Sequence, residues 1–106
     1  MKYEITYSPI AIDDLDCIYD EVFQASLDEN IANNYINELI DTIEIKADFP
    51  YSGTPLFFKN SLSIFRYVVY KSYIAFYYIE NETIFVYRVL YSKSDYLQKL
   101  KIASTK

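Results

Sequence analysis

Apolar residues recur with the spacing of an amphipathic helix in two consecutive segments of the N-terminal half. The first stripe is Ala11, Leu15, Ile18 and Val22, and the second is Ile36, Ile40, Ile43 and Ala47. Ser8-Pro9 precedes the first segment with the residue types that begin a helix. Asp28 or Asn30 can cap the second segment, and Phe49-Pro50 ends it. The two segments, joined by a short link, predict an antiparallel helical hairpin.

The pattern changes to that of β-strands after the hairpin. Residues 63–90 are rich in β-branched and aromatic residues, and two-residue turns divide them into strands over 64–70, 73–79 and 83–90. Turns this short join antiparallel neighbours, so the three strands predict a meander. A further short strand is expected over residues 2–7. Residues 51–55 read as a turn cluster, and residues 94–101 read as a short basic tail that can be helical.

These elements indicate an α+β fold, with the helices of the hairpin packed on an antiparallel sheet. The chain has 106 residues, which suits a single domain over 1–106. Aromatic residues make up 19% of the chain, a content that disordered chains lack.

Several catalytic chemistries are excluded by composition. There is no His, which rules out a Ser-His-Asp triad and a His-ligated zinc site. The single Gly rules out a glycine-rich phosphate loop, and the single Cys17 rules out an intrachain disulfide. We therefore expect neither a metal nor another cofactor.

Charge is divided along the chain. Residues 1–50 carry twelve acidic and two basic residues, whereas residues 51–106 carry three acidic and eight basic residues. The basic half can meet a polyanion or an acidic partner, or the two halves can pack together and cancel part of their charge. The N-terminus lacks the apolar segment of a signal peptide, and we expect a cytoplasmic protein that binds no membrane.

Several short motifs follow one another in order along nearly the whole chain. They are Tyr7-Ser8-Pro9 with Ala11, Asp14-Leu15, Ile18-Tyr19, Ala47-Asp48-Phe49-Pro50, Ser52-Gly53, Arg66 and the stretch 88–96. Together they resemble the RelE/ParE superfamily of bacterial toxins from type II toxin–antitoxin modules, which include plasmid stabilisation systems. The resemblance implies the fold predicted above and a small cognate antitoxin that wraps and inactivates the protein.

The resemblance implies one of two toxic activities. RelE-like members cut mRNA on the ribosome, and ParE-like members poison DNA gyrase without cutting anything. Tyr91 stands where many relatives have His, the basic pair that follows is reduced to Lys93 and Ser94, and the chain is acidic overall. These departures favour a ParE-like inhibitor of growth. A ribosome-dependent mRNA endonuclease and a toxin fold that has lost its activity are the alternatives.

Three residues are catalytic candidates if the protein is a nuclease, namely Arg66, Lys93 and Tyr96. Arg66 can hold a phosphate and stabilise developing charge, or it can pair with an acidic residue of the hairpin. Tyr96 can donate a proton or stack on a base, and Lys93 can contact phosphate. Without His the general base would have to be another group, such as Asp95. RNA cleavage through the 2′-hydroxyl needs no metal.

Two further residues are structural or phosphate-binding candidates, Arg88 and Tyr91. Strand alternation places Arg88 on one face with Ile84, Val86 and Leu90, where we expect it to bond carbonyls or a carboxylate. Asp13, Asp16 and Asp20 form an acidic stripe on the first helix, which we interpret as a solvated face because its spacing matches no metal loop.

Overall fold

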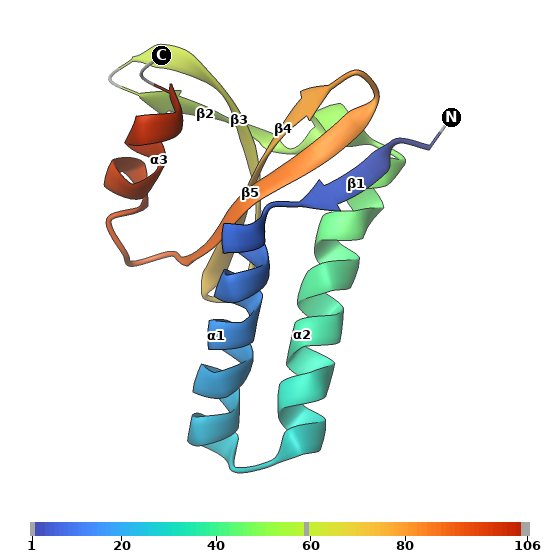
Figure 1. Ribbon diagram of the computed structural model, residues 1–106, viewed down its shortest axis with the longest axis vertical. Helices are drawn as coiled ribbons and strands as arrows, with labels where there is room; N and C mark the ends of the chain where they lie inside the picture. Colours follow the sequence, from blue (N-terminus) through green and yellow to red (C-terminus); the bar gives the residue numbers. More distant parts are fainter. Residues whose placement is uncertain (1, 59, 105–106) are drawn as a thin grey trace.

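Two long antiparallel helices lie side by side and project beyond one end of a twisted sheet (Figure 1). The computed structural model describes residues 2–58 and 60–104. The helices are α1 (Pro9–Ser26) and α2 (Glu29–Glu44). Ser8 Oγ accepts a hydrogen bond from the backbone N–H of Ala11, and the Asp28 carboxylate accepts from Asn30 and Ile31, so both helices begin with a side-chain cap. The predicted hairpin is confirmed.

The α2 helix ends earlier than the sequence pattern indicates. The chain leaves α-helical geometry after Glu44 and continues as two short 3₁₀ turns, η1 (Ile45–Ala47) and η2 (Pro50–Ser52). The backbone N–H of Tyr3 donates a hydrogen bond of 2.8 Å to the carbonyl of Ala47. The start of the chain therefore satisfies a carbonyl that follows the end of α2.

The sheet has five strands in the order β1-β5-β4-β3-β2. They are β1 (Glu4–Tyr7), β2 (Thr54–Phe58), β3 (Ser61–Tyr70), β4 (Tyr73–Glu80) and β5 (Thr83–Tyr91). The three strands of the predicted meander are β3, β4 and β5, and each pair is antiparallel. The N-terminal strand β1 joins β5 in parallel. The two helices and the strands β2, β3 and β4 therefore lie between these spatial neighbours in the sequence.

The strand β2 was not predicted, because Gly53 and Pro55 give this segment the composition of a turn. It pairs antiparallel with β3, with Thr54 opposite Tyr67 and a register shift between Pro55 and Phe57. An edge strand tolerates proline, since one side of its backbone has no partner strand to receive an N–H. β2 therefore forms one edge of the sheet despite its turn-like sequence.

Both faces of the sheet are covered. Along β4, Ala75 and Tyr77 pack in a core with α1 and α2, whereas Ile74 and Phe76 pack in a second core on the opposite face. The helix α3 (Tyr96–Ser104) covers this second core and buries Leu100 against it. The basic tail of the sequence is thus a helix that completes the domain (Figure 1).

A bulge between β4 and β5 reverses the faces of the last strand. Phe76 lies opposite Arg88, but the next residue of β4, Tyr77, lies opposite Val86, so Tyr87 is an extra residue. Val86 consequently packs towards α1 and α2, while Leu90 packs on the face of α3. The prediction that Arg88 shares one face with Ile84, Val86 and Leu90 is wrong, because strict alternation does not continue through a bulge.

Candidate functional site

Arg66 is held by the turn that precedes β2. Its Nη1 donates hydrogen bonds to the carbonyl oxygens of Tyr51 at 3.1 Å and Gly53 at 2.9 Å. Its guanidinium carbon also lies 5.2 Å from the centre of the Tyr51 ring, within the range of a cation–π contact. In the structure the side chain therefore bonds backbone carbonyls rather than a carboxylate of the hairpin.

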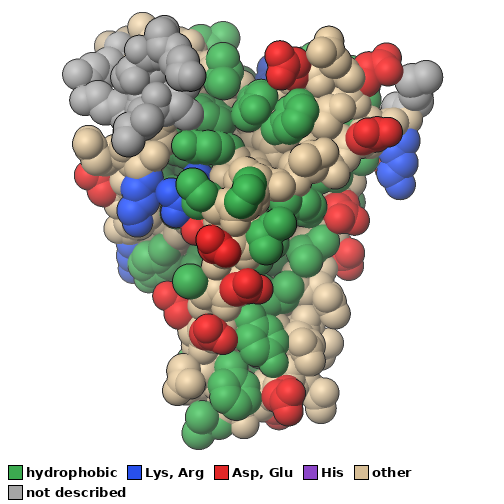
Figure 2. Space-filling model, in the orientation of Figure 1, with side chains coloured by type: hydrophobic (Ala, Val, Ile, Leu, Met, Phe, Trp, Pro, Cys, Tyr) green, Lys and Arg blue, Asp and Glu red, His purple; other side chains and the backbone are tan. Residues whose placement is uncertain are grey.

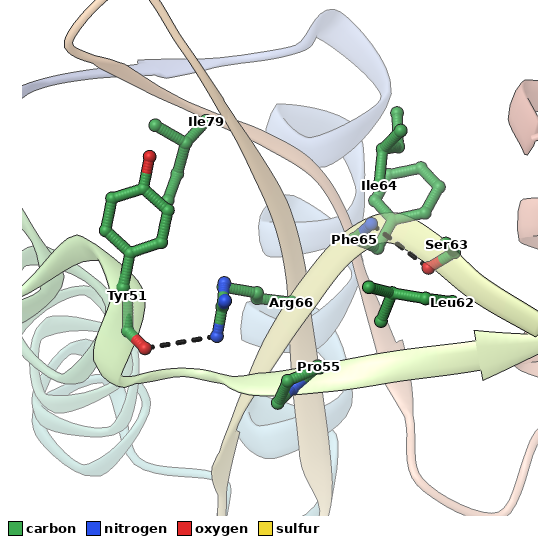
Figure 3. Close-up of a pocket in the computed structure, with 8 residues that line it drawn as sticks. All are labelled: Tyr51, Pro55, Leu62, Ser63, Ile64, Phe65, Arg66 and Ile79. Atoms are coloured by element: carbon green, nitrogen blue, oxygen red, sulfur yellow. Dashed lines mark hydrogen bonds between the residues drawn. The ribbon is translucent and has the colours of Figure 1, made fainter.

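A hollow of about 200 Å³ opens beside this side chain (Figure 3). It is lined by Tyr51, Pro55, Leu62, Ser63, Ile64, Phe65, Arg66 and Ile79. Figure 3 shows Tyr51 and Arg66 on one side and the apolar side chains of Leu62 and Ile64 on the other. A cation beside an exposed aromatic ring can bind a phosphate, a carboxylate or a stacked base.

Gly53 is required at this turn for space rather than for backbone freedom. Its φ is −69°, a value open to any residue, but an added Cβ would lie 2.1 Å from the Tyr77 hydroxyl oxygen. Tyr77 is fully buried and donates that hydroxyl to the Pro50 carbonyl at 2.8 Å. The buried tyrosine thus supports the same turn whose carbonyls hold Arg66.

Arg88 forms a bidentate ion pair with Asp14 of α1. The Nε–Oδ2 distance is 2.8 Å and the Nη2–Oδ1 distance is 3.0 Å. The hydrogen bond to Asp14 raises the pKa of Arg88 above its ordinary value. A carboxylate was one of the partners expected for Arg88, and the structure identifies it as that of Asp14.

The other candidates are distributed over different surroundings. Tyr91 packs edge-on against Tyr73 with ring centres 5.8 Å apart, and it lines a hollow of about 190 Å³ together with Arg88. Tyr96, the first residue of α3, is half-buried and packs against Phe76 of the core under this helix, with ring centres 5.3 Å apart. Lys93 and Asp95 are exposed. None of Lys93, Tyr96 and Asp95 lines the hollow beside Arg66.

Three tyrosine–glutamate pairs tie the sheet to the hairpin, and sequence reasoning missed them. The Tyr73 hydroxyl donates to Glu21 at 2.6 Å, and the Tyr70 hydroxyl donates to Glu38 at 2.6 Å. A longer contact of 3.5 Å joins the hydroxyl of Tyr7 to Glu44. Burial and the neighbouring glutamate raise the pKa of each of these tyrosines, that of Tyr70 to about 12. With 13 tyrosines in the chain, no signal in the sequence singled out these three.

Charge is distributed unevenly over the surface. Figure 2 shows Asp and Glu side chains spread along the hairpin, whereas Lys and Arg gather mainly next to α3. Within residues 2–58 and 60–104, no group of three His, Cys, Asp or Glu side chains is placed to hold a metal ion. Among the described helices, none has the length and apolarity needed to cross a membrane.

Comparison with protein families finds a match over most of the chain. A family model described as "ParE toxin of type II toxin-antitoxin system, parDE" matches residues 5–96. No curated protein sequence matches the chain.

Solved structures that resemble the fold include two toxin–antitoxin systems. The "Chromosomal ParDE TA system" from P. aeruginosa superposes with a TM-score of 0.72 at 14% identity, covering 87% of this chain and 98% of its own. The toxin–antitoxin complex RelBE2 from Mycobacterium tuberculosis superposes with a TM-score of 0.61 at 16% identity, covering 86% and 99%.

Proposed function

Because the chain belongs to the ParE toxin family of type II toxin–antitoxin systems, we propose that it inhibits growth by binding DNA gyrase without cleaving a substrate. A cognate antitoxin neutralises it, as expected for a module that stabilises a plasmid. The RelE/ParE fold expected from the sequence is confirmed, and the gyrase target is the part that we add.

The observation that supports a binding mechanism is the separation of the three nuclease candidates. One guanidinium nitrogen of Arg66 donates hydrogen bonds to two backbone carbonyls. Tyr96, at the start of α3, packs against Phe76. Lys93 is exposed and lines no part of the hollow beside Arg66. General acid–base catalysis needs its groups within hydrogen-bond reach of one reacting centre. Among the described residues, the three candidates do not form such a reacting centre, which favours a protein that acts by binding.

An antitoxin partner accounts for the surface of the hairpin. Large apolar side chains are exposed along it, including those of Ile10, Ile12 and Ile31. Exposed apolar residues in a polar surround are typical of protein interaction sites. The two structures compared above were both solved as toxin–antitoxin systems, which favours a partner of the same kind here.

A ribosome-dependent mRNA endonuclease is the second candidate, and the hollow beside Arg66 favours it. An exposed tyrosine ring next to a guanidinium group is a suitable surface for a base and its phosphate. In this alternative Arg66 contacts the substrate, and α3 has to shift for Tyr96 to reach it.

The two candidates are tested with the purified protein in two parallel reactions. One reaction measures supercoiling of relaxed plasmid by gyrase, and the other measures cleavage of mRNA on translating ribosomes. The proposal predicts that supercoiling falls to a plateau as the protein saturates gyrase, while the mRNA stays intact. Unchanged supercoiling with cut mRNA supports the endonuclease instead. If both reactions proceed normally, the chain is a toxin fold without activity.

A further inference from the structure

A third hollow, of about 370 Å³, lies between the C-terminal end of α1 and the turn that joins β3 to β4. It shares no residue with the hollow beside Arg66, but Glu21, Tyr73 and Tyr91 also line the smaller hollow that contains Arg88. Its lining residues are Glu21, Val22, Ala25, Ser26, Tyr35, Ser72, Tyr73 and Tyr91.

Three tyrosine rings dominate the walls of this hollow. Tyr73 lies in the middle, edge-on to Tyr35 with ring centres 6.2 Å apart and to Tyr91 with ring centres 5.8 Å apart. Glu21 is the one charged side chain in the lining, and the Tyr73 hydroxyl fixes its carboxylate through a hydrogen bond of 2.6 Å. Aromatic rings beside a carboxylate attract a cation, because both the ring faces and the carboxylate are negative.

The same cluster already makes contacts with a cation. The Lys71 ammonium group lies 5.3 Å from the centre of the Tyr35 ring and 5.4 Å from that of Tyr70. Lys71 is not part of the lining of the hollow. The ring of Tyr91 is 45% exposed, which leaves part of it accessible to a cation from another molecule.

The charge of the hairpin indicates the sign of the partner. The helix α1 carries five acidic residues and α2 carries four, and neither helix contains Lys or Arg. A basic segment is attracted to such a surface and steered towards the hollow. A long cationic side chain also fits, since its methylene groups can pack on Val22 and Ala25 while its head approaches Glu21.

We propose that this hollow receives an arginine or lysine side chain of the antitoxin, held between Tyr91, Tyr73 and the Glu21 carboxylate. This inference rests on the proposed function, because the antitoxin is the partner that presents the side chain. The cation is an anchor residue, and its contacts contribute a large part of the affinity at one point of the interface.

The test uses the protein encoded beside this chain as the probe and measures its affinity by calorimetry. The variants are Glu21→Gln, which removes the charge, and Tyr91→Ala, which removes the exposed ring. The matched controls are Asp16→Asn and Phe49→Ala, an exposed acid and an exposed aromatic outside the hollow. We expect both hollow variants to weaken binding roughly tenfold and both controls to stay within roughly twofold of the unmodified protein.

The salt dependence of the affinity distinguishes the loss of the Glu21 charge from a general loss of shape complementarity. Added salt should weaken binding of the unmodified protein more than binding of Glu21→Gln, because the variant lacks the screened pair. If the probe binds and neither hollow variant changes its affinity, the inference is overturned and the proposed function stands. If the probe does not bind the unmodified protein, the proposed antitoxin partner and this inference both fail.

Discussion

Arg88 of β5 and Asp14 of α1 are joined by two hydrogen bonds, and the same carboxylate also accepts the backbone N–H of Val89 at 3.0 Å. The pairing of β1 with β5 ends at Val86, so the edge of β5 beyond this residue has no partner strand. The contact between Arg88 and Asp14 lies at this open edge. Ser8 occupies the start of that edge, bonding the carbonyls of Val86 and Tyr87. The first turns of α1 thus satisfy backbone groups that a longer strand would otherwise pair.

Asp14→Ala is expected to destabilise the protein by about 2–3 kcal/mol, because Arg88 loses its partner and the Val89 N–H loses its acceptor. Urea unfolding gives this difference. Asp16→Ala is the control, since this neighbour on α1 is exposed, and its effect should stay within about 0.5 kcal/mol. Equal stabilities for the two variants would mean that the ion pair contributes nothing to the fold.

Gly53→Ala is expected to cost about 2–3 kcal/mol, because the new methyl group overlaps the buried ring of Tyr77. Tyr77→Phe alone removes one hydrogen bond and should cost about 1 kcal/mol. In the double variant the nearest clashing atom is absent, so the combined cost should be smaller than the sum of the two. Additive costs in thermal unfolding would contradict the close approach of Gly53 to Tyr77.

Alkaline pH is expected to weaken the fold through the tyrosine–glutamate pairs. The pKa of Tyr70 is raised from 10.0 to about 12, and that of Tyr73 is raised in the same direction. A raised pKa means that the folded protein keeps a proton that the unfolded chain releases, so this contribution is complete below pH 10 and is lost towards pH 12.

The check is the free energy of unfolding measured across that range of pH for the unmodified protein and for the Tyr70→Phe/Tyr73→Phe variant. The variant should lose less stability than the unmodified protein as the pH rises, because its two rings do not ionise. If the free energy of unfolding fell equally with pH in the two proteins, these tyrosines would not be the cause of the alkaline destabilisation.

Tyr96→Phe and Tyr96→Ala separate packing from chemistry. The ring of Tyr96 packs on Phe76, so Tyr96→Phe keeps this contact and should leave growth inhibition unchanged. Tyr96→Ala removes a half-buried ring that packs against the core under α3 and should cost about 2 kcal/mol of stability. The measurements are colony counts after induction and urea unfolding. Loss of inhibition in a stable Tyr96→Phe variant would show that the phenol takes part in chemistry.

Helices and central strands were predictable because their signals are local. The Ser8 and Asp28 caps, the apolar stripes and the two-residue turns each depend on a few adjacent residues. β2 was missed for the same reason, since Gly53 and Pro55 resemble a turn locally and become a strand only beside β3.

Features that depend on contacts between distant residues were less accessible. The bulge at Tyr87 leaves no mark in the sequence, and it changed the face assigned to the end of β5. Arg88 was expected to bond a carbonyl or a carboxylate, but selecting Asp14 among twelve acidic residues of the first half required the structure. The contact of Arg66 with two carbonyls likewise depends on a turn whose position β2 determines.

The most direct test of gyrase inhibition is to induce the protein alone in a bacterial host and pulse-label DNA synthesis and translation in the same culture. We expect DNA synthesis to fall first, translation to follow later, and co-expression of the neighbouring gene to restore both. If translation stops first while DNA synthesis continues, the protein does not act on gyrase and the endonuclease mechanism takes its place.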